Sequence, residues 1–417
     1  MRFLAFDTAA LARVFAVRNF ALYTAGSSIS QIGLWVQRMA IGWLVWDLTK
    51  SGVWLGAVAI AEFLPTMVVT PFAGVLSDRA DRRKVTMIAQ SLSAGIATIL
   101  WILTIFGWVE AWHVIALQFL SGALSSIAQS SRIALIPTLV PRDLVGQAVA
   151  INSISFNLAR FVGPALAGAL IATAGIGWTF FANAVSYIPV VWALDRMILP
   201  ERRLRATAGF LQEMVEGFTY AVTHHAIASL MVLMSLAAVF TRATIELLPG
   251  FADAVFGRGA SGLSMLTSAG GIGAVIAGLI LSQRRNHHGM TLLVIGAVMA
   301  NAAAIIAFAL TKNFAVAVVM MACSGACQVT SGTSSQTLVQ VAVPDAMRGR
   351  VMSNWLMINR GGPALGAMIF GWLSERYGWG WPTVLGSAVT VLACAWALRR
   401  RASLAAQLET NAHLRDQ

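Results

Sequence analysis

The sequence predicts an all-α integral membrane protein whose twelve transmembrane helices form two matching halves of six. Three observations lead to this fold class: the composition, the positions of the positive charges, and landmarks that recur in both halves. Of the 417 residues, 58% are hydrophobic and 11% are charged, whereas charged residues make up about a quarter of a soluble domain. Since about 20 apolar residues cross a bilayer, the hydrophobic content is sufficient for roughly a dozen crossings. A disordered chain and a soluble enzyme are therefore excluded.

Apolar runs bounded by turn residues define the twelve expected spans. Each run is long enough to cross the hydrocarbon core of a bilayer as a helix. In chain order the predicted spans are 20–46, 53–77, 85–107, 111–136, 146–173, 177–196, 226–250, 260–282, 290–310, 314–341, 348–373 and 378–399.

The positive charges lie mainly on one side of these spans. Of the 29 Lys and Arg residues, 20 fall in the two tails and the even-numbered loops, four in the odd-numbered loops and five within spans. The positive-inside rule then places both termini in the cytoplasm, and we expect a multi-pass protein of a bacterial inner membrane. Because topology explains the net charge of +12, nucleic acid is not expected as a partner.

Landmarks recur about 200 residues apart. The dipeptide Val-Pro at 140–141 returns at 343–344, and Gly-Pro-Ala-Leu at 163–166 returns at 362–365. Such repeated six-helix halves are the layout of secondary transporters that bind substrate between the halves. The expected division is a cytoplasmic tail at 1–19, a first bundle at 20–196, a cytoplasmic linker at 197–225, a second bundle at 226–399 and a tail at 400–417.

The loop after the second span carries the strongest motif. Residues 74–84 read Gly-Val-Leu-Ser-Asp-Arg-Ala-Asp-Arg-Arg-Lys, which is similar to the signature of the major facilitator superfamily, except that Asp81 replaces the usual glycine. The resemblance covers essentially the whole chain and implies the fold of that superfamily. It also implies a cytoplasmic gate, in which an aspartate faces a helix N-terminus of the other half; alternatively, the cations only fix topology. The gate residues are Gly74, Asp78, Arg79, Arg82 and Arg83.

The fifth span carries a second motif, built from small residues around a proline. Small residues let helices approach closely, and a proline removes one helical hydrogen bond. The pattern resembles one that marks exporters in the superfamily, although close packing alone also explains it. Together with neighbouring strings, it resembles the branch that contains the enterobactin exporter and macrolide and multidrug efflux proteins. The residues assigned to bending and packing, here and in the eleventh span, are Gly163, Pro164, Gly168, Gly362 and Pro363.

Two pairs of opposite charges lie inside the spans, where an ionisable group costs about 2.5–3.5 kcal/mol. Arg38 and Glu62 are expected at similar depth on adjacent antiparallel helices, and Arg242 and Glu246 at i and i+4 on the seventh span. Either pair is a permanent structural contact or a proton-coupling site whose carboxylate is loaded and unloaded. Asp47 is a further coupling candidate at the membrane edge, as is Asp78 of the gate loop.

Other polar and aromatic residues within the spans are candidates for lining a substrate cavity. The arginines could face an anionic or catecholate-like substrate or pair across the bundle, and the tryptophans could stack on an aromatic one. Arg132 could instead extend toward the cytoplasmic surface. The candidates are Gln31, Trp35, Arg132, Asn157, Arg160, Trp355, Asn359 and Arg360.

These patterns predict a transporter that exports small amphipathic organic molecules, of drug or siderophore type, by alternating access against proton entry. No nucleotide-binding, metalloprotease or esterase motif occurs in the sequence, so we expect no enzyme activity, no cofactor and no metal site. The expected partners are the bilayer, a small-molecule substrate and protons, and the expected state is a monomer. The alternatives are a facilitator or importer of sugars or metabolites, and a non-transporting receptor or scaffold.

Overall fold

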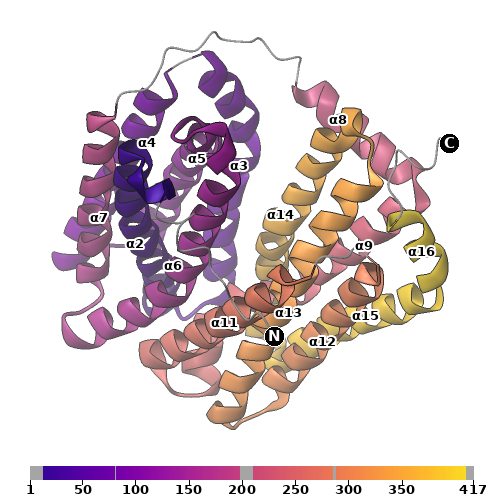
Figure 1. Cartoon of the computed structure of the whole chain (residues 1–417). Coiled ribbons are helices and arrows are strands. Elements are labelled where there is room, and N and C mark those ends of the chain that lie inside the picture. Colours follow the sequence, from indigo (N-terminus) through magenta and orange to yellow (C-terminus); the bar gives the residue numbers. More distant parts are fainter. Residues whose placement is uncertain (1–12, 80, 198–209, 285–287, 410–417) are drawn as a thin grey trace, which may run out of the picture. The chain divides into compact units, whose positions relative to one another are not determined.

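The computed structural model describes residues 13–79, 81–197, 210–284 and 288–409. Within these ranges the chain is built of helices joined by short turns and has no strand (Figure 1). The predicted fold class is thus confirmed. The helices form because the sequence offers long apolar stretches in which the backbone can satisfy its own hydrogen bonds.

Twelve helices in the described residues overlap the twelve predicted ranges, and the seventh is shorter than predicted. Ten of them are long and apolar enough to cross a membrane. The other two, α2 and α14, are the longest, and each carries several polar residues along its length. The helices are α2 (Arg18–Thr49), α3 (Gly52–Arg79), α4 (Arg82–Ile105), α5 (Ala111–Leu135), α6 (Val145–Thr173), α7 (Gly177–Arg196), α9 (His225–Phe240), α11 (Gly259–Ser282), α12 (Met290–Leu310), α13 (Phe314–Ala342), α14 (Asp345–Tyr377) and α15 (Gly380–Arg399).

The seventh predicted span is not one straight helix to residue 250. The α-helix α9 ends at Phe240 and is followed by a 3-10 turn at Arg242–Ile245, the short α10 (Leu248–Gly250) and a π-helical turn at Phe251–Val255. Pro249 contributes to the interruption because it has no N–H to donate to the preceding turn. Arg242 and Glu246, expected at i and i+4 of one α-helix, therefore lie at the start of the 3-10 turn and directly after it.

The repeat predicted from the sequence is visible in the backbone. Pro141 (φ −55°, ψ 154°) precedes the turn that starts α6, and Pro344 (φ −56°, ψ 150°) precedes α14. Each of these helices then contains a second proline, Pro164 and Pro363 respectively. The same extended proline thus precedes the corresponding helix of both halves.

The chain divides into two compact units. The first comprises residues 1–41 and 64–207, and the second comprises residues 42–63 and 208–417. In the first unit α4 packs against α5 and α7, and α6 also contacts α7. A cluster of buried side chains, including Phe20, Tyr187 and Leu194, forms its core. The division expected from the sequence, two six-helix bundles joined by a linker at 197–225, stays a prediction.

In the second unit α13 packs against α11 and α12, and α14 packs against α9 and the linker helix α8 (Phe210–Thr223). Arg350 of α14 forms an ion pair with Glu216 of α8, which fixes the amphipathic linker helix to this unit. The last described helix is α16 (Arg401–Leu408), after which Glu409 accepts hydrogen bonds from the backbone N–H groups of Gly289 (2.7 Å) and Thr291 (2.8 Å). A carboxylate therefore caps the N-terminus of α12, where a negative charge is favoured.

Candidate functional site

The second unit includes a helical hairpin from the start of the chain, residues 42–63, which joins the end of α2 to the beginning of α3. The turn between the helices is at Lys50, which adopts a left-handed conformation (φ 49°). This hairpin was not singled out in the sequence, and its contacts form a polar site in the second unit.

The hairpin packs on α14 through glycines. A Cβ added to Gly371 would lie 2.1 Å from the carbonyl oxygen of Gly52, and one added to Gly56 would lie 2.5 Å from the Cα of Met368. Further along, the ring of Phe63 occupies the space beside Gly361. The contacts advance along α3 as they recede along α14, so the two segments are antiparallel. We call this close contact between α3 and α14 the hairpin seam.

A cluster of polar groups closes the end of the hairpin. The ammonium of Lys50 lies 3.2 Å from Asp253 Oδ2 and 3.0 Å from Asp47 Oδ1, and Trp46 Nε1 donates to Asp253 Oδ2 at 2.8 Å. The indole of Trp46 also meets that of Trp379 edge-on, with centroids 5.3 Å apart. We call Trp46, Lys50 and Asp253, together with Ser51 and Glu375 described next, the hairpin latch.

Glu375, near the end of α14, holds the start of α3. Its Oε1 accepts a hydrogen bond from the hydroxyl of Ser51 and another from the backbone N–H of Val53 at 3.2 Å. The first N–H groups of a helix have no partner within the helix, and a carboxylate there is favoured by the helix dipole. The hairpin is thus tied to α14 at its tip as well as along the seam.

The latch stabilises its own charges. The hydrogen bond from Trp46 and the charge of Lys50 lower the pKa of Asp253, although partial burial opposes this. Partial burial lowers the pKa of Lys50, but hydrogen bonds to Asp47 and Asp253 outweigh it, so the net shift is upward. Both groups are therefore charged at neutral pH, and their pair is favoured over the separate ions.

In the first unit, the structure brings two predicted cavity residues, Trp35 and Arg160, together with the coupling candidate Arg38. The guanidinium carbon of Arg38 lies 5.6 Å from the centroid of the Trp35 ring, and that of Arg160 lies 5.7 Å from it. Phe156 contacts the same ring edge-on at 6.0 Å. A Cβ on Gly163 would be 2.4 Å from Trp35 Cβ, so this glycine lets α6 approach α2. We call this group the Trp35 cluster.

Two cations beside one indole can attract a ligand that combines negative charge with an aromatic ring. Cations over an aromatic face are stabilised by the ring quadrupole, and guanidinium groups bind carboxylates and other planar anions through two hydrogen bonds. The Trp35 cluster is thus chemically suited to an anionic, ring-containing molecule.

In the second unit, three predicted residues form a different arrangement. Arg242 Nη1 donates to Asn359 Oδ1 at 2.5 Å, Asn359 Nδ2 donates to the carbonyl of Trp355 at 2.9 Å, and Trp355 Nε1 donates to Ser335 Oγ at 3.2 Å. Gly362 approaches Ala238, where an added Cβ would lie 2.5 Å from the alanine Cβ. These hydrogen bonds connect three segments of the second unit: α13, α14 and the 3-10 turn that follows α9.

The remaining cavity candidates are dispersed. Gln31 is buried and donates to Ser27, Arg132 contacts Gln129 in the last turn of α5, and exposed Asn157 donates to the carbonyl of Ser153. Arg360 is exposed on α14. A cation in the last turn of a helix is favoured by the helix dipole, and both alternatives for Arg132 stay predictions.

The predicted coupling acids and packing residues also have defined positions. Glu62 is partly buried on α3, directly before the seam residue Phe63, and Glu246 follows the 3-10 turn. Arg38 belongs to the first unit and Glu62 to the second, so their pairing stays a prediction. Gly163, Pro164 and Gly168 are buried in α6.

At the gate loop, the side chains of Asp78 and Arg79 and the surroundings of Gly74 lie outside the described part of the structure. Arg82 is half-buried at the start of α4. Asp81 caps α4, accepting from the N–H of Arg83 at 2.9 Å. Arg83 in turn donates to the carbonyl of Met197 at 2.7 Å and lies 3.6 Å from Asp195. The aspartate that departs from the superfamily signature is thus a helix cap, and Arg83 joins α4 to the end of α7.

Metal binding has no support in the described ranges, where no group of three or more His, Cys, Asp or Glu side chains could hold an ion.

Comparison with solved structures identifies the class. A bacterial homologue of the human lysosomal transporter Spinster superposes with a TM-score of 0.72, covering 94% of this chain and 98% of that one at 13% identity. The protein therefore has the fold of the major facilitator transporters, and ten apolar helices in the described residues indicate a multi-pass membrane protein.

The family follows from the sequence comparison. The family model described as transmembrane secretion effector matches residues 9–416, and the chain belongs to that family. Relatives include the staphyloferrin A transporter of Staphylococcus aureus, 24% identical over 83% of this chain and 87% of that protein. Another is the enterobactin exporter of Escherichia coli, 26% identical over 86% of this chain and 84% of that protein.

Proposed function

We propose that the protein exports small anionic organic molecules, of siderophore or drug type, by alternating access coupled to proton entry. The observation that carries this proposal is the Trp35 cluster, in which Arg38 and Arg160 both lie within 6 Å of one indole ring. Two positive charges and an aromatic face suit a substrate with carboxylates or catecholates. The staphyloferrin A and enterobactin relatives support the same substrate class.

Export, rather than import, is supported by the secretion family and by the exporter relative. The proline and small residues of α6 support it independently. The bias of Lys and Arg supports an orientation with both termini in the cytoplasm, and the Escherichia coli relative supports a bacterial inner membrane. With that orientation the hairpin latch is on the outer side, and the gate loop is on the cytoplasmic side.

In the proposed cycle, the hairpin latch and seam hold the outer side closed while substrate enters from the cytoplasm. Glu62 is the proposed proton carrier because it directly precedes Phe63, which packs against α14. A proton arriving at this carboxylate changes the charge on α3 beside the seam. The protein performs this cycle as a monomer.

The proposal is tested in proteoliposomes, with and without an imposed pH gradient, using a panel of dyes, macrolides and catecholates. We expect gradient-driven accumulation of at least one anionic aromatic compound on the side opposite the cytoplasmic face. Transport that is independent of the gradient would indicate a facilitator, accumulation in the reverse direction an importer, and no movement of any solute a receptor or scaffold.

The role of the Trp35 cluster is tested by Arg160→Gln. We expect at least a tenfold loss in transport of the anionic substrate. The matched control is Arg258→Gln, which removes another guanidinium from an aromatic ring, that of Phe314 at 5.4 Å, and should leave transport unchanged. Equal losses in both variants would remove the special role of Arg160.

The coupling role is tested by Glu62→Gln, which should abolish proton-driven export in a folded protein while leaving exchange of substrate without a gradient. Normal gradient-driven transport by this variant would contradict the assignment. Asp78→Asn should trap one orientation, read out by the accessibility of cysteines placed on either side of the membrane.

A further inference from the structure

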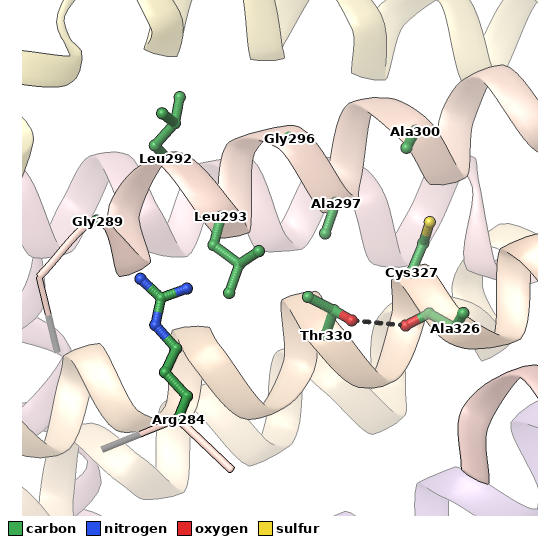
Figure 2. A pocket seen from close by; sticks show the side chains of 10 residues that line it. All are labelled: Arg284, Gly289, Leu292, Leu293, Gly296, Ala297, Ala300, Ala326, Cys327 and Thr330. Carbon is green, nitrogen blue, oxygen red and sulfur yellow. Dashed lines mark hydrogen bonds between the residues drawn. The ribbon is translucent and has the colours of Figure 1, made fainter. Parts of the chain in front are cut away.

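A groove on the second unit is separate from every residue used in the proposed transport cycle. It lies between α12 and α13 beside the end of α11, and has a volume of about 490 Å³ (Figure 2). We infer that this groove binds an anionic phospholipid, with an acyl chain along the apolar groove and the headgroup phosphate at Arg284.

The groove exists because small residues face one another along two helices. Gly296, Ala297 and Ala300 of α12 lie opposite Ala326 and Cys327 of α13. A Cβ added to Gly296 would meet no atom within 4 Å, so the space beside this glycine is open. Larger side chains at these positions would fill it.

The surroundings of the groove are those of a surface in contact with lipid. Both α12 and α13 are long and apolar enough to cross a membrane. Leu292, on the rim, is 48% exposed, which is expected of an apolar side chain that faces acyl chains. Because the groove is open along its length, an acyl chain can enter it laterally from the bilayer.

A positive charge stands at one end of this apolar surface. Figure 2 shows Arg284 beside Leu293 and Gly289, at the end of the groove away from Cys327. The guanidinium donates to the carbonyl of His288 at 2.5 Å. A guanidinium carries five N–H donors, so it can bind this carbonyl and a phosphate oxygen together. The carboxylate of Glu409 lies at the same end, where the N–H groups of Gly289 and Thr291 and the N-terminus of α12 offset its charge. These N–H groups are therefore not offered to a phosphate, and its recognition falls to Arg284.

Charge complementarity favours an anionic lipid over other occupants. Arg284 is in the loop after the eighth span, which the positive-inside rule assigns to the cytoplasmic side. The cytoplasmic leaflet carries the anionic lipids, and basic pockets between helices on that side bind their headgroups. A groove with an apolar length and one cationic end matches the two parts of such a molecule.

The test is native mass spectrometry of the full-length delipidated protein, titrated with phosphatidylglycerol or with phosphatidylcholine. We expect retention of phosphatidylglycerol several-fold above that of phosphatidylcholine, reduced several-fold by Arg284→Gln and by Gly296→Leu. The matched control is Gly278→Leu, since Gly278 also faces open space on a membrane-spanning helix but does not line the groove; it should bind as the wild type does.

Three results would overturn the inference. Equal retention of the two lipids would remove the role of the headgroup charge. Unchanged binding by Gly296→Leu in a protein with normal thermal unfolding would show that the lipid lies elsewhere. Displacement of the lipid by millimolar inorganic phosphate would show that the site recognises the phosphate without the acyl chain.

Discussion

The two ends of α3 are held by different kinds of contact. At its beginning, Gly52 meets α14 backbone to backbone, and the Val53 N–H is capped by Glu375 from the other half of the sequence. Just beyond its end, Asp81 caps the next helix of its own half, and Arg83 bonds to the end of α7 in the same unit. The start of α3 is therefore connected to the second repeat, and the loop at its end stabilises the first.

This difference indicates where a conformational change can act with least cost. The contacts of the hairpin with Asp253 and α14 join residues 203 to 324 positions apart in the chain, and each can be broken without unfolding a helix. The contacts of Asp81 and Arg83 complete the ends of α4 and α7, so breaking them loosens the unit itself. The following predictions test this comparison.

The largest effect is expected at the hairpin seam. Gly371→Ala places a Cβ 2.1 Å from the carbonyl oxygen of Gly52, and overpacking of this kind costs about 1–3 kcal/mol. We expect a lower midpoint of thermal unfolding and loss of transport. Gly332→Ala on α13, where an added Cβ meets nothing within 4 Å, is the control. Wild-type transport by Gly371→Ala would show that transport does not require the close contact at the hairpin seam.

A smaller effect is expected from the latch. Asp253→Asn removes the ion pair with Lys50, and we expect a several-fold larger population with the hairpin displaced. The measurement is the distance distribution between spin labels at Leu48→Cys and Leu385→Cys, two exposed positions of the second unit, with the native cysteines replaced by serine. Asp195→Asn, which removes the partner of Arg83, should leave this distribution unchanged; an equal response would remove the distinction between the two ends.

The pH dependence of the latch is expected to be flat near neutrality. The pKa of Asp253 is lowered from its ordinary 3.8, so its contribution is present above 3.8 and is lost as the pH falls through the lower folded value. The pKa of Lys50 is raised from 10.5, so its contribution is present below 10.5 and is lost as the pH rises through the higher folded value. The same spin-label distances should therefore not change between pH 5 and 9. A midpoint within that interval would make Asp253 a proton-coupling residue in place of Glu62.

The smallest effect is expected at the helix cap of the gate loop. Asp81→Ala removes the side chain that caps α4, and loss of such a cap costs about 1 kcal/mol. We expect a slightly lower unfolding temperature and unchanged hairpin distances, whereas Asp81→Asn should retain the cap. A change in hairpin distances in the alanine variant would connect the two ends of α3.

The fold was predictable because each segment that crosses a membrane must by itself be apolar and form a helix, so its own sequence is sufficient to identify it. The eleventh span was predicted from residue 348, and α14 begins three residues earlier at Asp345, directly after Pro344; the repeat of Val-Pro at 140–141 and 343–344 is the sequence signal of that start. Trp35, Arg160 and Gly163 were singled out separately, as an aromatic ring, a charge within a span and a small residue respectively, and the structure brings them into one cluster.

The hairpin latch was not predicted, because its members are individually ordinary. Asp253 and Glu375 lie near span ends, where acids are common, and only their distances to Lys50 and Val53 distinguish them. One signal was present: Gly52 and Gly56 form the G-x-x-x-G spacing typical of close helix contacts. The break after Phe240 was also missed, because an apolar run does not show where a helix tightens into a 3-10 turn.

The length of α2 has a consequence for how the two proposed sites communicate. Trp35 lies 15 residues before Lys50, the residue at the turn of the hairpin, which corresponds to about 22 Å along a helix. The helix α2 is unbroken as far as Thr49. No loop separates Trp35 from the tip of the hairpin along this helix. Substrate recognition at Trp35 and closure at the hairpin would then both depend on the position of one helix, α2.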